Sequence, residues 1–225
     1  WLLKTRNRRK QDVRIRILME ADAFTHILQD WRSVGYPFGH LVPSLASAIG
    51  SSGDRPDALA QLMGIILNGG VQLPTTRIEQ LHFAAATPYD TEFDYAPTAP
   101  RRVLAPEVAA TVREALMGVV AGGTAARMKN AYLDAAGTPI LVGGKTGTGD
   151  NRFEQFGRGG QVIASRAVDR TATFVFFIGD RFFGTVTAYV RGEEANNYHF
   201  TSALAVQLLK SLAPDLKPLI DGAKP

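Results

Sequence analysis

Apolar residues in the last third of the chain come in short runs that predict β-strands. The segment 138–142 reads as a buried strand, and the segments 170–180 and 184–191 are rich in β-branched and aromatic residues. Such residues favour the pleated, half-buried surface of a sheet. Consecutive strands joined by short connections pair antiparallel, so we expect an antiparallel sheet here.

Four other segments repeat apolar residues at the spacing of a helix. In the second of them, Asp54 can cap the start, Pro56 fits the first turn, and Gly69 or Gly70 can supply a left-handed end. The four helices are predicted at 13–33, 56–68, 106–120 and 200–212. The expected fold class is therefore α+β, with an antiparallel sheet packed between helices.

The remaining segments lack a clear period. The segment 87–100 is predicted to be the longest surface loop, and the glycine-rich segment 155–160 is predicted to be a mobile loop. Residues 214–225 are expected to form a flexible tail. The length of 225 residues and the apolar content of 45% fit one large domain, so residues 1–225 are taken as part of a single domain.

The most informative sequence is Gly-Gly-Lys-Thr-Gly-Thr-Gly at 143–149, which follows the first predicted strand, so its Lys-Thr-Gly part is expected at a strand edge. A phosphate-binding P-loop is one interpretation, but that motif needs glycine at the position of Pro139 and a helix afterwards. Residues 148–151 have poor helix propensity, so the P-loop is disfavoured. The alternative is the Lys-Thr-Gly element of penicillin-binding proteins and serine β-lactamases.

Other segments extend this likeness in the same order along the chain. They are Pro43 to Ser52, Arg55 to Gln61, the Asn-Gly-Gly sequence at 68–70, and the Gly-Gly-Thr-Ala sequence at 122–125. From about residue 13 to about residue 213 the chain resembles the transpeptidase domain of class A, bifunctional penicillin-binding proteins, which also carry a glycosyltransferase domain. The resemblance implies the serine β-lactamase and transpeptidase fold.

The nucleophile of that family is a serine followed three residues later by lysine, because one helical turn places the amine beside the hydroxyl. No serine or threonine of this chain has lysine at that spacing. In the family this element lies upstream of the segments matched above. We therefore expect the chain to be the carboxy-terminal part of the domain, without turnover by itself.

The second family element, Ser-x-Asn, is expected near the start. Thr5-Arg6-Asn7 has suitable chemistry with threonine in place of serine, whereas the family spacing favours Lys10-Gln11-Asp12, a poorer chemical match. Thr5 and Asn7 are the preferred candidates. A basic, solvated terminus would explain both segments equally simply.

The resemblance implies roles for the residues of the Lys-Thr-Gly strand. Lys145 would keep a positive field and help hold the substrate carboxylate, to which Thr146 and Thr148 would offer hydroxyls. The backbone N–H of Thr148 would form half of an oxyanion hole, and Gly147 would let the substrate lie along the strand. Gly149 is the last residue of this expected substrate site.

The implied partners are peptidoglycan stem peptides ending in D-Ala-D-Ala and β-lactams. Family members work in the periplasm or on the outer face of the cytoplasmic membrane, held by an amino-terminal anchor. No apolar stretch of this chain reaches the length of a membrane span, so membrane contact is expected only through such an upstream anchor. No cofactor is expected.

Charge and composition add two exclusions. The net charge is +4 and basic residues cluster between positions 4 and 16, but no aromatic platform or recognition helix accompanies them, so nucleic acid is not an expected partner. The chain has no cysteine, and its four histidines at 26, 40, 82 and 199 show no ligand spacing, so no metal is predicted.

Two alternatives remain open. A transpeptidase-like module that has lost its nucleophile would act as a binding or scaffolding protein of cell-wall assembly. A class A β-lactamase shares the implied fold, but it needs an additional glutamate base for deacylation, and none can be identified here.

Overall fold

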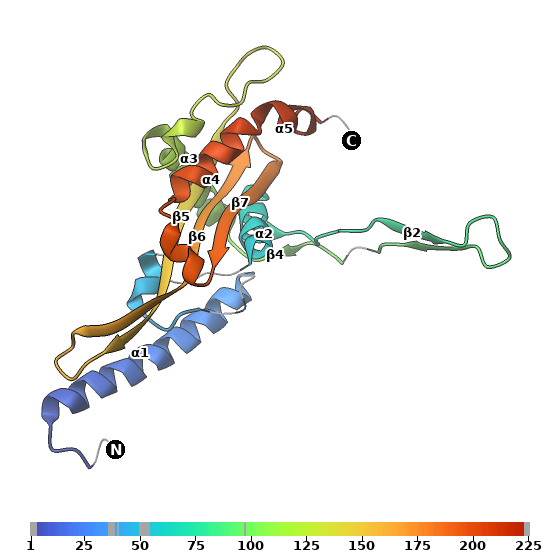
Figure 1. Cartoon of the computed structure of the whole chain (residues 1–225). Coiled ribbons are helices and arrows are strands. Elements are labelled where there is room, and N and C mark those ends of the chain that lie inside the picture. Colours follow the sequence, from blue (N-terminus) through green and yellow to red (C-terminus); the bar gives the residue numbers. More distant parts are fainter. Residues whose placement is uncertain (1–3, 36–38, 40, 50–54, 97, 223–225) are drawn as a thin grey trace.

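The computed structural model describes residues 4–35, 39, 41–49, 55–96 and 98–222. In these ranges a sheet and its helices form a body from which one long arm extends (Figure 1). The helices are α1 (Arg8–Ser33), α2 (Pro56–Leu67), α3 (Pro106–Gly122), α4 (Ser202–Ser211) and α5 (Ala213–Ile220), with short 3-10 helices η1 (Leu45–Ile49), η2 (Ala126–Met128) and η3 (Glu193–Asn197). The strands are β1 (Val71–Gln72), β2 (Gln80–Phe83), β3 (Thr91–Asp94), β4 (Arg101–Arg102), β5 (Val142–Phe156), β6 (Val162–Ile178) and β7 (Phe182–Arg191).

The central sheet has three antiparallel strands in the order β5-β6-β7, as the sequence predicts. The boundaries of the first strand were predicted wrongly. It begins at Val142 and runs through the whole glycine-rich motif to Phe156, because the β-branched and aromatic strand β6 pairs with it along its length. The expected loop at 155–160 is therefore a hairpin turn, closed by a hydrogen bond from Gly157 N to Gln161 O of 2.8 Å.

Helices cover both faces of this sheet, which confirms the expected α+β arrangement. On one face, Phe174, Phe176 and Ile178 of β6 pack with Val206 and Leu209 of α4. On the other face lie α2 and α3, where Phe177 is completely buried. Burial of one such phenylalanine contributes about 2 to 3 kcal/mol, so β6 anchors the body.

The predicted helices are present, with shifted ends. Helix α1 starts at Arg8, five residues early, because the side chain of Asn7 accepts a hydrogen bond from Lys10 N at 3.0 Å. Helix α2 starts at Pro56, and its expected cap Asp54 lies outside the described residues. Gly69 and Gly70 follow the helix with φ of +60° and +86°, which confirms the left-handed end. None of the described helices is long and apolar enough to cross a membrane.

Two segments predicted to lack regular structure are ordered. Within the expected loop 87–100, strand β3 pairs antiparallel with β2, so a hairpin replaces most of the loop. The strands have four residues each, too few to show a convincing period in the sequence. The expected tail from 214 is helical as far as Ile220, since Leu216 and Ile220 pack against the core; residues 223–225 lie outside the described part.

Tyr132 makes the free energy of unfolding fall as the pH rises in the alkaline range. Its hydroxyl donates to Leu209 O at 3.0 Å, and burial raises the pKa of Tyr132 from 10.0 to about 12. Between pH 10 and 12 the unfolded chain ionises this tyrosine while the folded chain keeps it neutral. The contribution of neutral Tyr132 to the free energy of unfolding is therefore complete below pH 10. As the pH rises to 12, about 2 to 3 kcal/mol of this free energy is lost.

We expect Tyr132→Phe to cost about 1 kcal/mol at neutral pH and to flatten this alkaline dependence. Urea unfolding of both proteins at a series of pH values between 8 and 12 measures the difference. If the variant loses stability as steeply as the parent above pH 10, Tyr132 is not the group responsible.

Candidate active site

The Lys-Thr-Gly sequence lies inside β5, at an edge of the sheet as far as the structure describes it. Strand β6 pairs with β5 on one side, and no described strand pairs with it on the other. Helix α3 and the start of α4 pack close to β5. The motif is thus held by neighbours behind it while one strand edge stays open.

The four glycines of the motif divide into two kinds. Gly143 and Gly144 are buried, and a Cβ atom at Gly144 would lie 2.7 Å from the Phe174 ring and closer still to the Val175 carbonyl oxygen. A Cβ atom at Gly143 would overlap the Phe177 ring. These two glycines therefore serve close packing.

Gly147 differs, because a Cβ atom there would meet nothing within 4 Å. The residue is exposed, so the space over the strand at this point is open to solvent. At Gly149 an added Cβ would make ordinary contacts of 3.8 and 3.9 Å. Gly147 is therefore the glycine of the motif that leaves room for a ligand, and packing does not require it.

Lys145 is exposed on this strand. Its Nζ donates to the carbonyl oxygen of Thr146 at 2.8 Å. Successive side chains of a strand point to opposite faces, so Lys145 and Gly147 share one face and Thr146 and Thr148 share the other. One anion can meet both the amine and the hydroxyls only across the free edge of β5.

Both hydroxyls already have fixed partners. Thr146 is buried, and its Oγ1 lies 2.6 Å from Oγ1 of Thr124, which follows α3. Thr148 Oγ1 accepts a hydrogen bond from Ser202 N at 2.9 Å, at the first residue of α4. Since a hydroxyl has one donor and two acceptor positions, each threonine can still make a further bond.

Arg170 fixes the chain where α4 begins. Its Nε donates to Phe200 O at 2.9 Å, and its guanidinium lies over the Phe200 ring at 5.6 Å from the centroid. The same guanidinium is 3.8 Å from a carboxylate oxygen of Asp150. The positive end of the α4 dipole is thereby held beside Thr148, which favours negative charge at this part of the strand.

The structure does not bring Thr5 and Asn7 together with Lys145. Thr5 Oγ1 accepts from Asn7 N at 3.3 Å, and the Asn7 side chain caps α1. Among the residues that the structure describes, no hydrogen bond or ion pair joins Thr5 or Asn7 to the motif. The alternative triplet 10–12 lies within α1.

Sequence reasoning assigned no role to Thr124 or Ser202. The only signal for Thr124 was its place in the Gly-Gly-Thr-Ala sequence, and Ser202 contributes a backbone N–H, which no side-chain pattern reveals. Among the described residues, no three His, Asp or Glu side chains are placed to hold a metal ion.

Comparison with known proteins gives similarity only at the level of solved structures; no family model and no curated protein matches the chain. The chain is similar to PBPA from Mycobacterium tuberculosis, with 16% identity, a TM-score of 0.45, and coverage of 76% of this chain and 34% of that one. The TP domain of Burkholderia pseudomallei penicillin-binding protein 3 shares 19% identity, with a TM-score of 0.46 and coverage of 87% and 57%.

Penicillin binding protein 3 from Mycobacterium tuberculosis, solved in complex with aztreonam, has 16% identity and a TM-score of 0.47, with coverage of 84% of this chain and 45% of that one. The chain thus spans between a third and somewhat over half of the length of these three proteins. These three solved structures are of penicillin-binding proteins.

Proposed function

We propose that this chain forms the Lys-Thr-Gly side of a serine D,D-transpeptidase of peptidoglycan synthesis that also binds β-lactams. A serine hydroxyl attacks the amide carbonyl between the two D-Ala residues of a stem peptide, giving an acyl ester and releasing the terminal D-Ala. An amine of a neighbouring strand then attacks the ester, which forms the cross-link and returns the serine hydroxyl. The serine belongs to a segment of a longer protein, outside these 225 residues.

The observation that carries this proposal is the open edge of β5 at residues 145–148. An extended peptide can add to such an edge through backbone hydrogen bonds. Gly147 leaves the approach unobstructed, and the amine of Lys145 lies on the same strand. A substrate with a free carboxylate at its end would meet a positive side chain and the positive end of α4 in one place.

Three residues of the strand have defined roles in this proposal. Lys145 holds the carboxylate by charge, and the backbone N–H of Thr148 donates to the developing oxyanion. Thr146, kept in one rotamer by Thr124, donates or accepts a hydrogen bond at the same edge. We assign no step to Thr5 and Asn7, because the amide oxygen of Asn7 caps α1.

Acylation by penicillin tests the proposal. The full native gene product and the 225-residue chain are incubated separately with benzylpenicillin, and their intact masses are compared. We expect a penicilloyl adduct on the long protein alone, at a serine with lysine three residues later. An adduct on the short chain would show that the nucleophile lies within these residues, contrary to the proposal.

A scaffolding module of cell-wall assembly is the second candidate. These 225 residues contain no Ser-x-x-Lys sequence, which favours the scaffolding function. Without that nucleophile the chain can bind a ligand but cannot form an acyl ester with it. In that case neither protein would gain the mass of penicillin. The long protein would carry a substitution at the serine or at its lysine.

The proposed place of action is the outer face of the cytoplasmic membrane, where peptidoglycan strands are accessible. The proposed partners are stem peptides and β-lactams, without nucleic acid, metal or cofactor. Contact with the membrane is proposed to depend on an amino-terminal anchor of the longer protein.

A further inference from the structure

The arm, defined as residues 78–96, carries an apolar face that the body does not cover. Strands β2 and β3 pair Leu81 with Phe93, and the Phe83 and Phe93 rings meet edge to face with centroids 6.0 Å apart. All eight strand residues of the hairpin are exposed, and Phe93 has 58% of its surface accessible. Figure 1 shows the arm extending away from the sheet, so its own body cannot bury this face.

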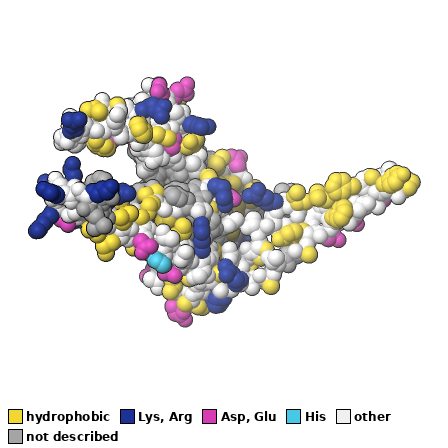
Figure 2. Space-filling view, turned by 90° about the horizontal axis from the view of Figure 1, so that it is seen from below, with side chains coloured by type: hydrophobic (Ala, Val, Ile, Leu, Met, Phe, Trp, Pro, Cys, Tyr) yellow, Lys and Arg dark blue, Asp and Glu magenta, His cyan; other side chains and the backbone are white. Residues whose placement is uncertain are grey.

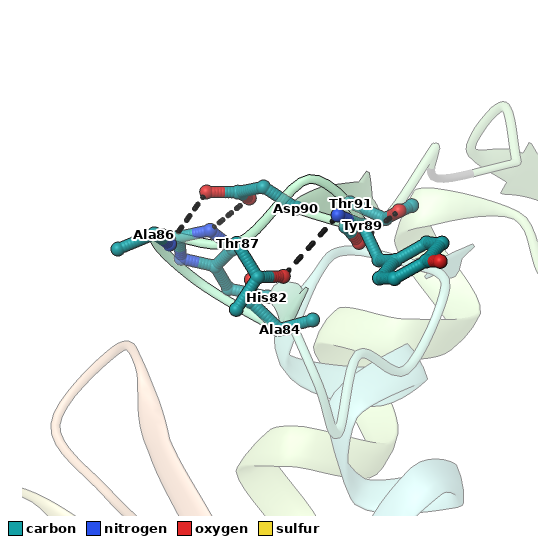
Figure 3. A network of polar contacts seen from close by, with 7 residues as sticks. All are labelled: His82, Ala84, Ala86, Thr87, Tyr89, Asp90 and Thr91. Atoms are coloured by element: carbon teal, nitrogen blue, oxygen red, sulfur yellow. Dashed lines mark hydrogen bonds and ion pairs between the residues drawn. The ribbon is translucent and has the colours of Figure 1, made fainter.

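An isolated two-stranded hairpin is marginally stable in water unless its apolar face is packed. This arm nevertheless has a defined tip (Figure 3). His82 Nε2 lies 2.6 Å from Asp90 Oδ1, while Asp90 Oδ2 accepts from Ala86 N at 3.0 Å. Ala84 and Ala86 have φ of 51° and 60°, which alanine rarely adopts, and these bonds hold them there. A hairpin with a turn fixed by hydrogen bonds and an exposed apolar face is suited to binding another protein surface.

The charge of the arm indicates what it docks with. The arm contains four acidic residues, at 79, 90, 92 and 94, and neither Lys nor Arg. Because the whole chain has a net charge of +4, the rest of the chain carries a formal charge of +8. An anionic bilayer would repel the arm, and a basic protein surface with an apolar floor would attract it.

The chain itself presents such a surface at the base of the arm. A groove of about 910 Å³ there is lined by apolar Ile65, Leu73 and Phe183 and by Arg101 and Arg181. Two carboxylates also line the groove, and both are engaged: Asp57 pairs with Arg55 and Arg77, and Asp180 pairs with Arg113. No carboxylate of the described residues pairs with Arg101 or Arg181. Figure 2 shows the hydrophobic side chains along the arm and Lys or Arg side chains where it joins the body.

We propose that the arm docks with a second copy of this chain. The apolar face of one arm lies in the arginine-lined groove of the other copy, and the exchange is reciprocal, with the two arms antiparallel. In such a two-fold arrangement the same pair of surfaces meets twice, so each contact is made by both copies. The phenylalanines of each arm are then covered, and the acidic residues of each arm lie close to Arg101 and Arg181 of the other copy.

Sedimentation of the 225-residue chain at rising concentration tests this proposal. We expect a monomer–dimer equilibrium that weakens at higher salt, because opposite charges attract across the interface. Phe83→Ser with Phe93→Ser should raise the dissociation constant about tenfold or more. The matched control is Tyr189→Ser on β7, equally exposed at 57%, which should leave the equilibrium unchanged.

Charge reversal distinguishes this interface from nonspecific hydrophobic association. Glu79→Lys with Glu92→Lys should weaken the dimer about tenfold, as should Arg101→Glu with Arg181→Glu, and combining all four changes should restore most of the affinity. Circular dichroism and the thermal midpoint of each variant show that it remains folded. The proposal is overturned if the chain is monomeric at every concentration, or if the arm substitutions leave the dimer unchanged. It is also overturned if the variant with all four charge changes dimerises no better than the two double variants, or if the arm binds lipid vesicles.

Discussion

Gly144→Ala is expected to destabilise the chain by about 3 kcal/mol or more, among the largest losses that a single added methyl group can cause. The new Cβ atom would lie 2.7 Å from the Phe174 ring and closer to the Val175 carbonyl oxygen. Phe174 is fully buried and cannot turn away, and Val175 is fixed in the ladder that joins β6 to β5 and β7. Relief therefore requires β5 to move away from β6.

Gly147→Ala is the matched control, because the same methyl group is added to the same strand three residues later. Nothing lies within 4 Å of that Cβ position, so the free energy of unfolding should change by no more than about 0.5 kcal/mol. Urea unfolding of the three proteins gives both differences. Equal losses at 144 and 147 would mean that the packing around β5 is not as described.

The body of the fold was predictable where residues repeat with a clear period. The strands at 170–180 and 184–191 correspond to β6 and β7, because their β-branched and aromatic residues fit a pleated, half-buried surface. The glycine-rich part of β5 has no such preference. It is a strand because β6 supplies its hydrogen bonds, and that tertiary contact leaves no trace in the local sequence.

The arm shows a different reason for failure. Its strands have four residues each, and Pro88 and the polar residues around the tip favour a loop. The hairpin is held by the pairing of residues eight or more positions apart, such as Gln80 with Asp94, and by the bonds of Asp90. Local sequence patterns do not show which of these distant residues pair.

For the candidate site, the motif could be found from the sequence and its surroundings could not. Lys145, Thr146 and Gly147 stand out because they interrupt an apolar pattern. The partners of the two threonines come from 22 and 54 residues away, Thr124 before the strand and Ser202 after it. Their positions depend on how α3 and α4 pack on the sheet, and residue chemistry alone does not fix that packing.

In the long protein that carries the serine, Lys145→Ala is expected to lower the second-order rate constant of acylation by benzylpenicillin about a thousandfold, or about 4 kcal/mol. Under the proposed function the amine supplies the positive charge that meets the ligand carboxylate at the open edge of β5. The loss should not come from unfolding, because Lys145 is exposed and its described bond is to the carbonyl of its own neighbour.

Two further variants separate the charge of Lys145 from its geometry. Lys145→Arg keeps the charge but replaces a compact ammonium by a planar guanidinium, so we expect about a tenfold loss, between the parent and Lys145→Ala. Lys210→Ala removes an exposed lysine of α4 and should leave the rate unchanged. Stopped-flow acylation at several salt concentrations gives the rates. If the Lys145→Ala variant is acylated at the serine as fast as the parent, the carboxylate does not bind at this strand edge. The roles proposed for Thr146 and Gly147 would then also be wrong.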